Sequence, residues 1–253
     1  MNRLRKMGAL LAGIALLASQ WGCKAKPAEN SGFLENPDLM AQNPKLPFQK
    51  FYWNKQHDPK TYTEIMVAPV DTRYILAQNI WEKASAANIT EEQVRTAVQA
   101  IADYARQSFV RAASEDPRKR FTVVDKAGPH TVILEVALVQ VVPSKAVMNA
   151  LGYVTWVPAV IQTAGSLSTG SEDSGKGVVA IEARFRDGAT GDVIGMFADR
   201  ERPKAALLDL KSLNWWAPAK VIVDEWSGQL IDLANMPPGG TVKDSPTFEL
   251  LVW

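Results

Sequence analysis

The sequence predicts an α+β fold, in which an antiparallel or mixed sheet carries two main helices on one face. Three observations support this prediction. Residues 131–142 are apolar on both faces of a strand, as at the centre of a covered sheet. Residues 90–116 and 217–233 repeat apolar side chains at helical spacing. Residues 179–186 alternate apolar and charged residues, and a turn leads the chain back through residues 193–198. This order of elements favours a single domain with helices packed on the sheet.

A capping box marks the start of the first predicted helix. Thr90 supplies the N-cap oxygen, Gln93 follows three residues later, and Pro117 limits the helix at its far end. The predicted buried face of this helix comprises Val94, Ala97, Val98, Ile101, Ala105, Phe109 and Ala112. The second helix has its own apolar face, and the run Met236-Pro-Pro-Gly-Gly follows it. Both helices are therefore expected to cover the sheet.

Further strands are predicted from short apolar runs. Residues 62–70 and 121–125 fit strands that precede the long one, and residues 248–253 can add an edge strand. Between residues 179 and 186 the charged side chains Glu182, Arg184 and Arg186 alternate with apolar ones, which predicts a strand half exposed to solvent. The Gly-rich stretch from Asp187 to Asp192 predicts a hairpin loop.

The first 22 residues have the pattern of a secretory signal. Arg3, Arg5 and Lys6 precede an uncharged run of 12 residues, which is too short to span a bilayer core of about 30 Å as a helix. After this run, Gly22-Cys23 resembles the cleavage site of bacterial lipoproteins, although Gln20 and Trp21 differ from the usual residues. The resemblance implies lipidation of Cys23. The alternative is an ordinary secretory signal that is cleaved near Ala18.

Lipoprotein sorting and domain organisation follow from this interpretation. In lipoproteins of two-membrane bacteria an aspartate after the cysteine favours inner-membrane retention. Lys24 stands there instead, which implies an outer-membrane lipoprotein facing the periplasm. The Pro-, Asn- and Lys-rich stretch that follows predicts a tether. We therefore expect a signal peptide at residues 1–22, a tether at 23–52 and a single α+β domain at 53–253.

Composition excludes several classes of function. The chain has 253 residues and a formal net charge of +1, and no run of five like charges exists. Nucleic-acid binding would need a larger basic footprint. Cys23 is the only cysteine, so neither an internal disulfide nor a cysteine-based zinc site can form. The chain contains no phosphate loop, dinucleotide fingerprint or nucleophile elbow.

No residues form a recognisable catalytic set. His57 beside Asp58 suggests acid–base chemistry, but neighbours in an extended chain point apart, and an exposed loop is the favoured interpretation. His130 is interpreted as a turn residue. Glu182 and Asp187 are interpreted as solvent-facing charges near Arg184 and Arg186. We therefore predict no catalytic, cofactor-binding or metal-binding residue, no cofactor and no enzymatic activity.

Four stretches together resemble a known family. They are Ser31-Gly-Phe-Leu34, Tyr62-Thr-Glu-Ile-Met-Val-Ala-Pro-Val70, Gly128-Pro-His-Thr131 and Ile181-Glu-Ala-Arg-Phe-Arg-Asp-Gly-Ala-Thr-Gly-Asp192. As a set they are similar to bacterial lipoproteins of the domain of unknown function 3313, over about residues 31–233. The resemblance implies a location in the cell envelope and supplies no activity. It assigns no functional residue beyond Cys23.

One apolar stretch, residues 144–167, contains a single charged residue, Lys145. It is interpreted either as a helix packed on the sheet or, because Gly152 and Pro158 interrupt helical continuity, as an exposed contact surface. The candidate contact residues are Val147, Met148, Leu151, Tyr153, Trp156, Val157, Val160 and Ile161. Three hypotheses result. The first is a non-enzymatic envelope lipoprotein that binds a protein partner or helps an envelope assembly. The second is a binder of lipid or another apolar ligand, and the third is an enzyme, a hydrolase whose site the sequence does not reveal.

Overall fold

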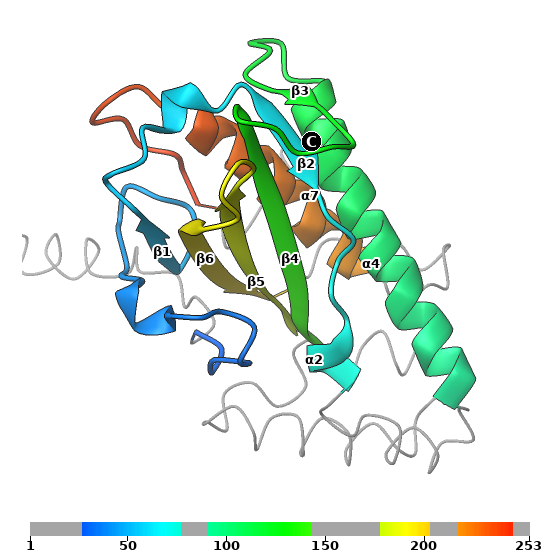
Figure 1. Ribbon diagram of the computed structural model, residues 1–253. Helices are drawn as coiled ribbons and strands as arrows, with labels where there is room; N and C mark the ends of the chain where they lie inside the picture. Colours follow the sequence, from blue (N-terminus) through cyan, green and yellow to red (C-terminus); the bar gives the residue numbers. More distant parts are fainter. Residues whose placement is uncertain (1–26, 77–90, 143–177, 203–216, 245–253) are drawn as a thin grey trace, which may run out of the picture.

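A mixed six-stranded sheet forms the centre of the molecule, in the order β1-β6-β5-β4-β2-β3 (Figure 1). The computed structural model describes residues 27–76, 91–142, 178–202 and 217–244. In sheet order the strands are β1 (Lys50–Trp53), β6 (Val193–Glu201), β5 (Val178–Asp187), β4 (Thr131–Val142), β2 (Glu64–Val67) and β3 (Thr122–Val123). Pairs from β1 to β4 are antiparallel, whereas β2 pairs in parallel with β4 and β3. The prediction of a mixed sheet is confirmed.

Two long helices cover one face of this sheet, behind it in Figure 1. They are α4 (Glu91–Ser114) and α7 (Ala217–Ala234), and both agree with the predicted helices. The other helical segments in the described ranges are short: α2 (Arg73–Leu76) and two 3-10 turns, η2 (Pro37–Leu39) and η3 (Pro59–Thr61). The predicted α+β class, with two main helices on one face, is therefore correct.

The main core lies between the helices and the sheet. Alternate residues of β4, β5 and β6 point inward, and Trp226 of α7 is fully buried against them. The Trp226 Nε1–H donates to Asp199 Oδ2 at 2.7 Å, so the buried indole has its hydrogen-bond partner. Phe48 stacks on Phe197 with ring centroids 4.2 Å apart, which ties the chain before β1 to the same core.

A second, smaller core lies on the opposite face of the sheet, which we call the outer face. Residues 31–41, which we call the strap, place Phe33, Leu34 and Met40 against Ala137 of β4 and Met196 of β6. The tether predicted for residues 23–52 is therefore wrong from residue 31 onward, because these apolar side chains are buried and β1 begins at Lys50. The strap forms part of the folded domain.

The strap also explains a second difference from the sequence prediction. β5 was expected to be half exposed, yet its burial is nearly continuous and Glu182 retains only 3 % of its surface. Glu182 and Asp187, which are both buried, are therefore not solvent-facing charges. An alternating pattern predicts that one face of a strand is exposed to solvent only when no other segment covers that face. Here the strap covers it, and the strap lies about 150 positions earlier in the chain.

Several predictions fall outside the described residues. These are the signal segment and Cys23, the Thr90 cap, the apolar stretch 144–167 and the edge strand at 248–253. Within the described ranges, no helix has the length and apolar character needed to cross a membrane.

Candidate functional site

Polar contacts fix the first residues of the strap to the middle of the sheet. Ser31 donates twice to Glu182, from its backbone N–H at 3.0 Å and from its Oγ at 2.6 Å. Glu182 pairs with Ala137 of β4 on one side and with Ala198 of β6 on the other, so it lies on a central strand. The folded chain therefore begins on the outer face of the sheet and not at its edge.

Two arginines of β5 hold the next turn of the strap. Arg186 reaches Glu35 at 2.5 Å and Glu135 at 2.9 Å, and Arg184 binds the same two carboxylates. Arg184 also donates to the Phe33 carbonyl at 2.8 Å and lies 4.3 Å from the centre of the Phe33 ring. Burial alone would raise the pKa of Glu135, but hydrogen bonds from both arginines outweigh it and lower this pKa.

The strap also contacts α2. The Phe33 ring meets the Tyr74 ring edge-on, with centroids 5.7 Å apart, and the Tyr74 hydroxyl lies 3.5 Å from the Gly32 carbonyl. Arg73 in the same short helix pairs with Asp71 at 2.6 Å. The contacts with Tyr74 and those with β5 together hold the strap against the outer face of the sheet.

A second polar cluster lies near the hairpin between β5 and β6. The Tyr62 hydroxyl donates to Asp187 Oδ2 at 2.8 Å, and His57 Nδ1 lies 3.0 Å from the same hydroxyl. Because the hydroxyl proton points to Asp187, its oxygen is left to accept from the Nδ1–H of His57. The Ala189 and Thr190 N–H groups donate to the other carboxylate oxygen. All three side chains thus serve one another or the turn.

The electrostatics of this cluster fit a structural role. Burial, followed by the hydrogen bond to Asp187, raises the pKa of Tyr62 far above its usual range. Burial alone would raise the pKa of Asp187, but hydrogen bonds from Tyr62 and from the turn N–H groups outweigh it and lower that pKa. A tyrosine that stays protonated and a carboxylate that stays ionised form a stable donor–acceptor pair over the neutral pH range.

As expected for neighbours in an extended chain, His57 and Asp58 do not pair, but His57 is half-buried and not exposed as predicted. Asp58 instead caps η3 by accepting from the Lys60 N–H at 2.9 Å, whereas His57 approaches Asp187, 130 positions later, at 3.9 Å. Sequence spacing gave no signal for this distant contact. His130 lies in a turn, as predicted, and its carbonyl accepts from the N–H groups of Thr63 and Glu64.

A third polar cluster joins the two long helices. Asp224 of α7 accepts from the Tyr104 hydroxyl at 2.6 Å, from Arg111 at 2.8 Å and from Ser108 Oγ. Ser108 is buried and also lies 2.9 Å from Ser227 Oγ. Lys220 lies 4.7 Å from the centre of the Tyr104 ring. The cluster holds α4 and α7 together, and the Asp224 side chain stays partly exposed to solvent.

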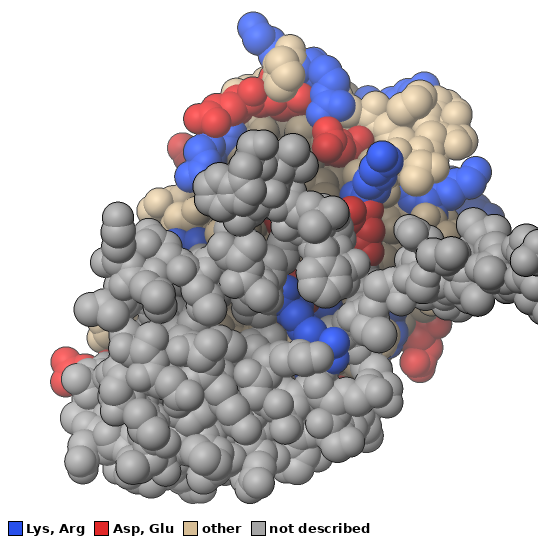
Figure 2. Space-filling model, turned by 180° about the vertical axis from the view of Figure 1, so that it is seen from behind, with Lys and Arg blue, Asp and Glu red and all other residues tan. Residues whose placement is uncertain are grey.

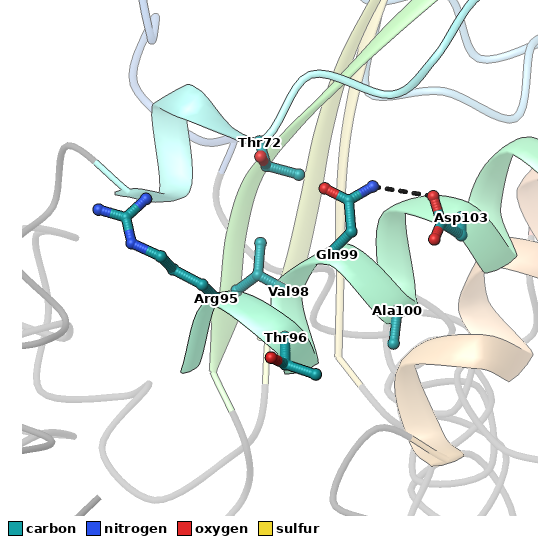
Figure 3. A pocket seen from close by; sticks show the side chains of 7 residues that line it. All are labelled: Thr72, Arg95, Thr96, Val98, Gln99, Ala100 and Asp103. Carbon is teal, nitrogen blue, oxygen red and sulfur yellow. Dashed lines mark hydrogen bonds between the residues drawn. The ribbon is translucent and has the colours of Figure 1, made fainter. Parts of the chain in front are cut away.

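A shallow pocket of about 630 Å³ lies beside the first half of α4 (Figure 3). Its lining is mixed polar and apolar and comprises Thr72, Arg95, Thr96, Val98, Gln99, Ala100 and Asp103. Gln99 donates to Asp103 at 2.8 Å across one turn of the helix. Neither a histidine nor a nucleophile with a neighbouring base lines this pocket, so its described walls suggest no particular reaction.

Charges of both signs are mixed on the described part of the surface seen in Figure 2, without a patch of one sign. Over the described ranges, no group of three or more His, Cys, Asp and Glu side chains is placed to hold a metal ion.

Comparison with protein families identifies the chain. The model of a family described as a protein of unknown function (DUF3313) matches residues 29–230. The chain belongs to this family. The match begins just before the strap and ends within α7, so it spans the strap, the sheet and most of α7 of this DUF3313 protein.

No curated protein matches this DUF3313 chain in sequence. Among solved structures, it is similar to the PelC dodecamer from Paraburkholderia phytofirmans, with 12% identity over 65% of this chain and 88% of that one, and a TM-score of 0.32. A point variant of the same protein gives 11% identity, coverage of 67% and 90%, and a TM-score of 0.33. Similarity at this level does not establish a shared function.

Proposed function

We propose that this protein is a lipid-anchored lipoprotein of the bacterial cell envelope, attached through Cys23, whose domain binds a protein partner without catalysing a reaction. One observation carries the proposal: the only cysteine of the chain follows Gly22, a few residues after a basic and then apolar segment, at the position where lipidation requires it. Because Lys24 follows, we place the anchor in the outer membrane, facing the periplasm.

The polar clusters support the non-enzymatic part of the proposal. His57, Tyr62 and Asp187 bond to one another and to a turn, and Asp224 holds α4 against α7. An active site instead presents a base, a nucleophile or an oxyanion donor to a substrate. These groups are used to hold elements together, which suits a rigid binding module.

Replacing the cysteine tests the anchor. Cys23→Ala should move the protein from the membrane fraction to the soluble fraction, because no acyl chain can be attached. Lys24→Asp is the matched control, which keeps the cysteine and should stay in membranes while shifting toward the inner one. If Cys23→Ala sediments with membranes as the parent does, the anchor lies elsewhere.

A separate experiment tests the protein partner. Crosslinking of the parent protein in intact cells, followed by identification of the attached proteins, would identify this partner.

A second candidate function is binding of lipid or another apolar ligand. The observation that favours it is the apolar stretch 144–167, which carries a single charge over 24 residues. If this stretch contacts a ligand, Trp156→Ser should leave the melting curve unchanged and abolish co-purification of lipid. If Trp156 is core, the substitution should cost about 3–5 kcal/mol of stability, and the melting curve would reveal it.

A further inference from the structure

We infer that the outer face of the sheet, where the strap lies, faces the lipid bilayer, and that the α4–α7 layer faces away from it. This inference rests on the proposed lipidation of Cys23 and adds the orientation of the domain on the membrane. The occupant of the outer face is thus the bilayer surface, and the helix layer is left open to a protein partner.

The first step is the length of free chain. Since Ser31 is fixed by two hydrogen bonds to Glu182, only residues 24–30 separate the cysteine from the fold. Eight residue steps span at most about 26–29 Å when fully extended. A flexible chain of this length has a root-mean-square reach of only about 14–17 Å.

The second step is the place where this chain is rooted. Glu182 lies on β5, which is two strands from the β1 edge, on the face opposite the helices. To bring the helix layer against the bilayer, the free chain would first run about 10 Å sideways past β6 and β1. It would then pass the sheet and a helix layer about 10–12 Å thick. That path uses nearly the full extension of the chain.

The third step is the composition of the outer face. Leu39 in η2 of the strap is 53 % exposed, and it is the exposed large hydrophobic residue among those the structure describes. The helix layer instead exposes the polar groups around Asp224, with Arg111 and Lys220 close by. When the strap lies against the bilayer, Leu39 contacts the interfacial region and residues 24–30 do not have to be fully extended. The opposite orientation stretches the tether and turns Leu39 away from the bilayer.

Depth-dependent fluorescence quenching tests the orientation. Because lipidation blocks the Cys23 thiol, a single new cysteine can be labelled selectively in the lipidated chain. Leu39→Cys places the dye on the strap, and Gly228→Cys places it on α7, where a Cβ meets nothing within 4 Å. The labelled proteins are added to preformed phosphatidylcholine vesicles that contain a brominated lipid.

The expected result is a larger loss of fluorescence at position 39 than at position 228. Equal quenching at both positions, or stronger quenching at 228, would overturn the inferred orientation. Lengthening the free chain with a flexible Gly-Ser insertion after Glu29 should reduce the contrast between the two labels; an unchanged contrast would also count against the tether as its cause. Failure of the proposed lipidation looks different: the parent chain would then react with the dye at Cys23 and would not bind vesicles.

Discussion

Buried carboxylates in this protein fasten loops to the ends of helices. Asp116 follows α4 and its side chain is almost fully buried. It accepts hydrogen bonds from the Arg120 N–H at 3.1 Å, the Arg118 guanidinium at 3.1 Å and the Asn235 amide at 2.9 Å. One carboxylate therefore joins the loop after α4 to the end of α7.

Because of these hydrogen bonds, the unfolding free energy of the protein should fall in acid. Burial alone would raise the pKa of Asp116, but the hydrogen bonds from Asn235, Arg120 and Arg118 outweigh it and lower the pKa to about 2. A carboxylate with a lowered pKa stabilises the fold above its unfolded pKa, and this contribution is lost as pH falls toward the folded value. The window lies between about pH 4 and pH 2.

Asp116→Asn should therefore lower the unfolding free energy at neutral pH and flatten its decline between about pH 4 and pH 2. Chemical denaturation at a series of pH values measures both effects. Asp38→Asn, at an exposed residue of η2, is the control and should leave the profile unchanged. A parent-like acid profile in Asp116→Asn would show that this carboxylate does not control the transition.

The neighbours of His57 illustrate which contacts the sequence could not predict. His57 was recognised as a candidate, but its true neighbours, Tyr62 and Asp187, could not be predicted, because the Tyr62–Asp187 contact spans 125 positions. Local spacing predicts which residues share a helix face or strand face. It carries no information about which distant loop packs against a side chain.

Among the elements, β1 depends on a glycine in its neighbour. Gly195 of β6 pairs with Trp53, and a Cβ at Gly195 would come within 2.6 Å of the Trp53 ring and 3.0 Å of the Phe185 ring. The glycine therefore makes room for Trp53 on the inner face, where the Trp53 indole N–H also donates to the His57 carbonyl at 2.8 Å.

Gly195→Ala should destabilise the protein by about 1–3 kcal/mol, as overpacking of a core commonly does. The matched control is Gly228→Ala, at a helical site with open space around the new methyl group, which should stabilise by about 0.5–1 kcal/mol. Thermal or urea unfolding of both variants checks the difference in sign. If both variants changed the unfolding free energy in the same direction, the Trp53 ring would have moved to accept the new methyl group without loss of stability.

Regular elements were predictable because their own residues carry the pattern. The range of β4 and the ends of α4 and α7 agree with the predictions to within about two residues. The strap was not predictable as part of the fold, because its prolines and polar residues have the composition of a linker. Phe33, Leu34 and Met40 were the available signal, and their partners on β4 and β6 lie far along the chain.

For the whole molecule, the strap moves the start of the folded domain to residue 31 or earlier. A chain that begins at residue 42 lacks three buried apolar side chains, each worth about 1.5–3 kcal/mol. These losses are large against a typical stability of about 5–15 kcal/mol. A chain that begins at residue 27 keeps all three of them.

The chain from residue 42 should therefore unfold at a clearly lower denaturant concentration than the chain from residue 27. It should also bind an apolar dye, because Met196 and Ala137 lose their cover. Equal midpoints for the two chains would show that the strap adds nothing to stability. Urea unfolding followed by circular dichroism supplies the comparison.

The long separation between Ser31 and Glu182 has a consequence for biosynthesis. The strap leaves the ribosome 151 residues ahead of the carboxylate that fixes it. At about 5–20 residues per second, translation alone sets a delay of about 8–30 s. During that interval the strap has no docking partner on the sheet, because Glu182 has not yet been made. Docking of the strap on the outer face is therefore expected among the last events of folding, once β5 has joined the sheet.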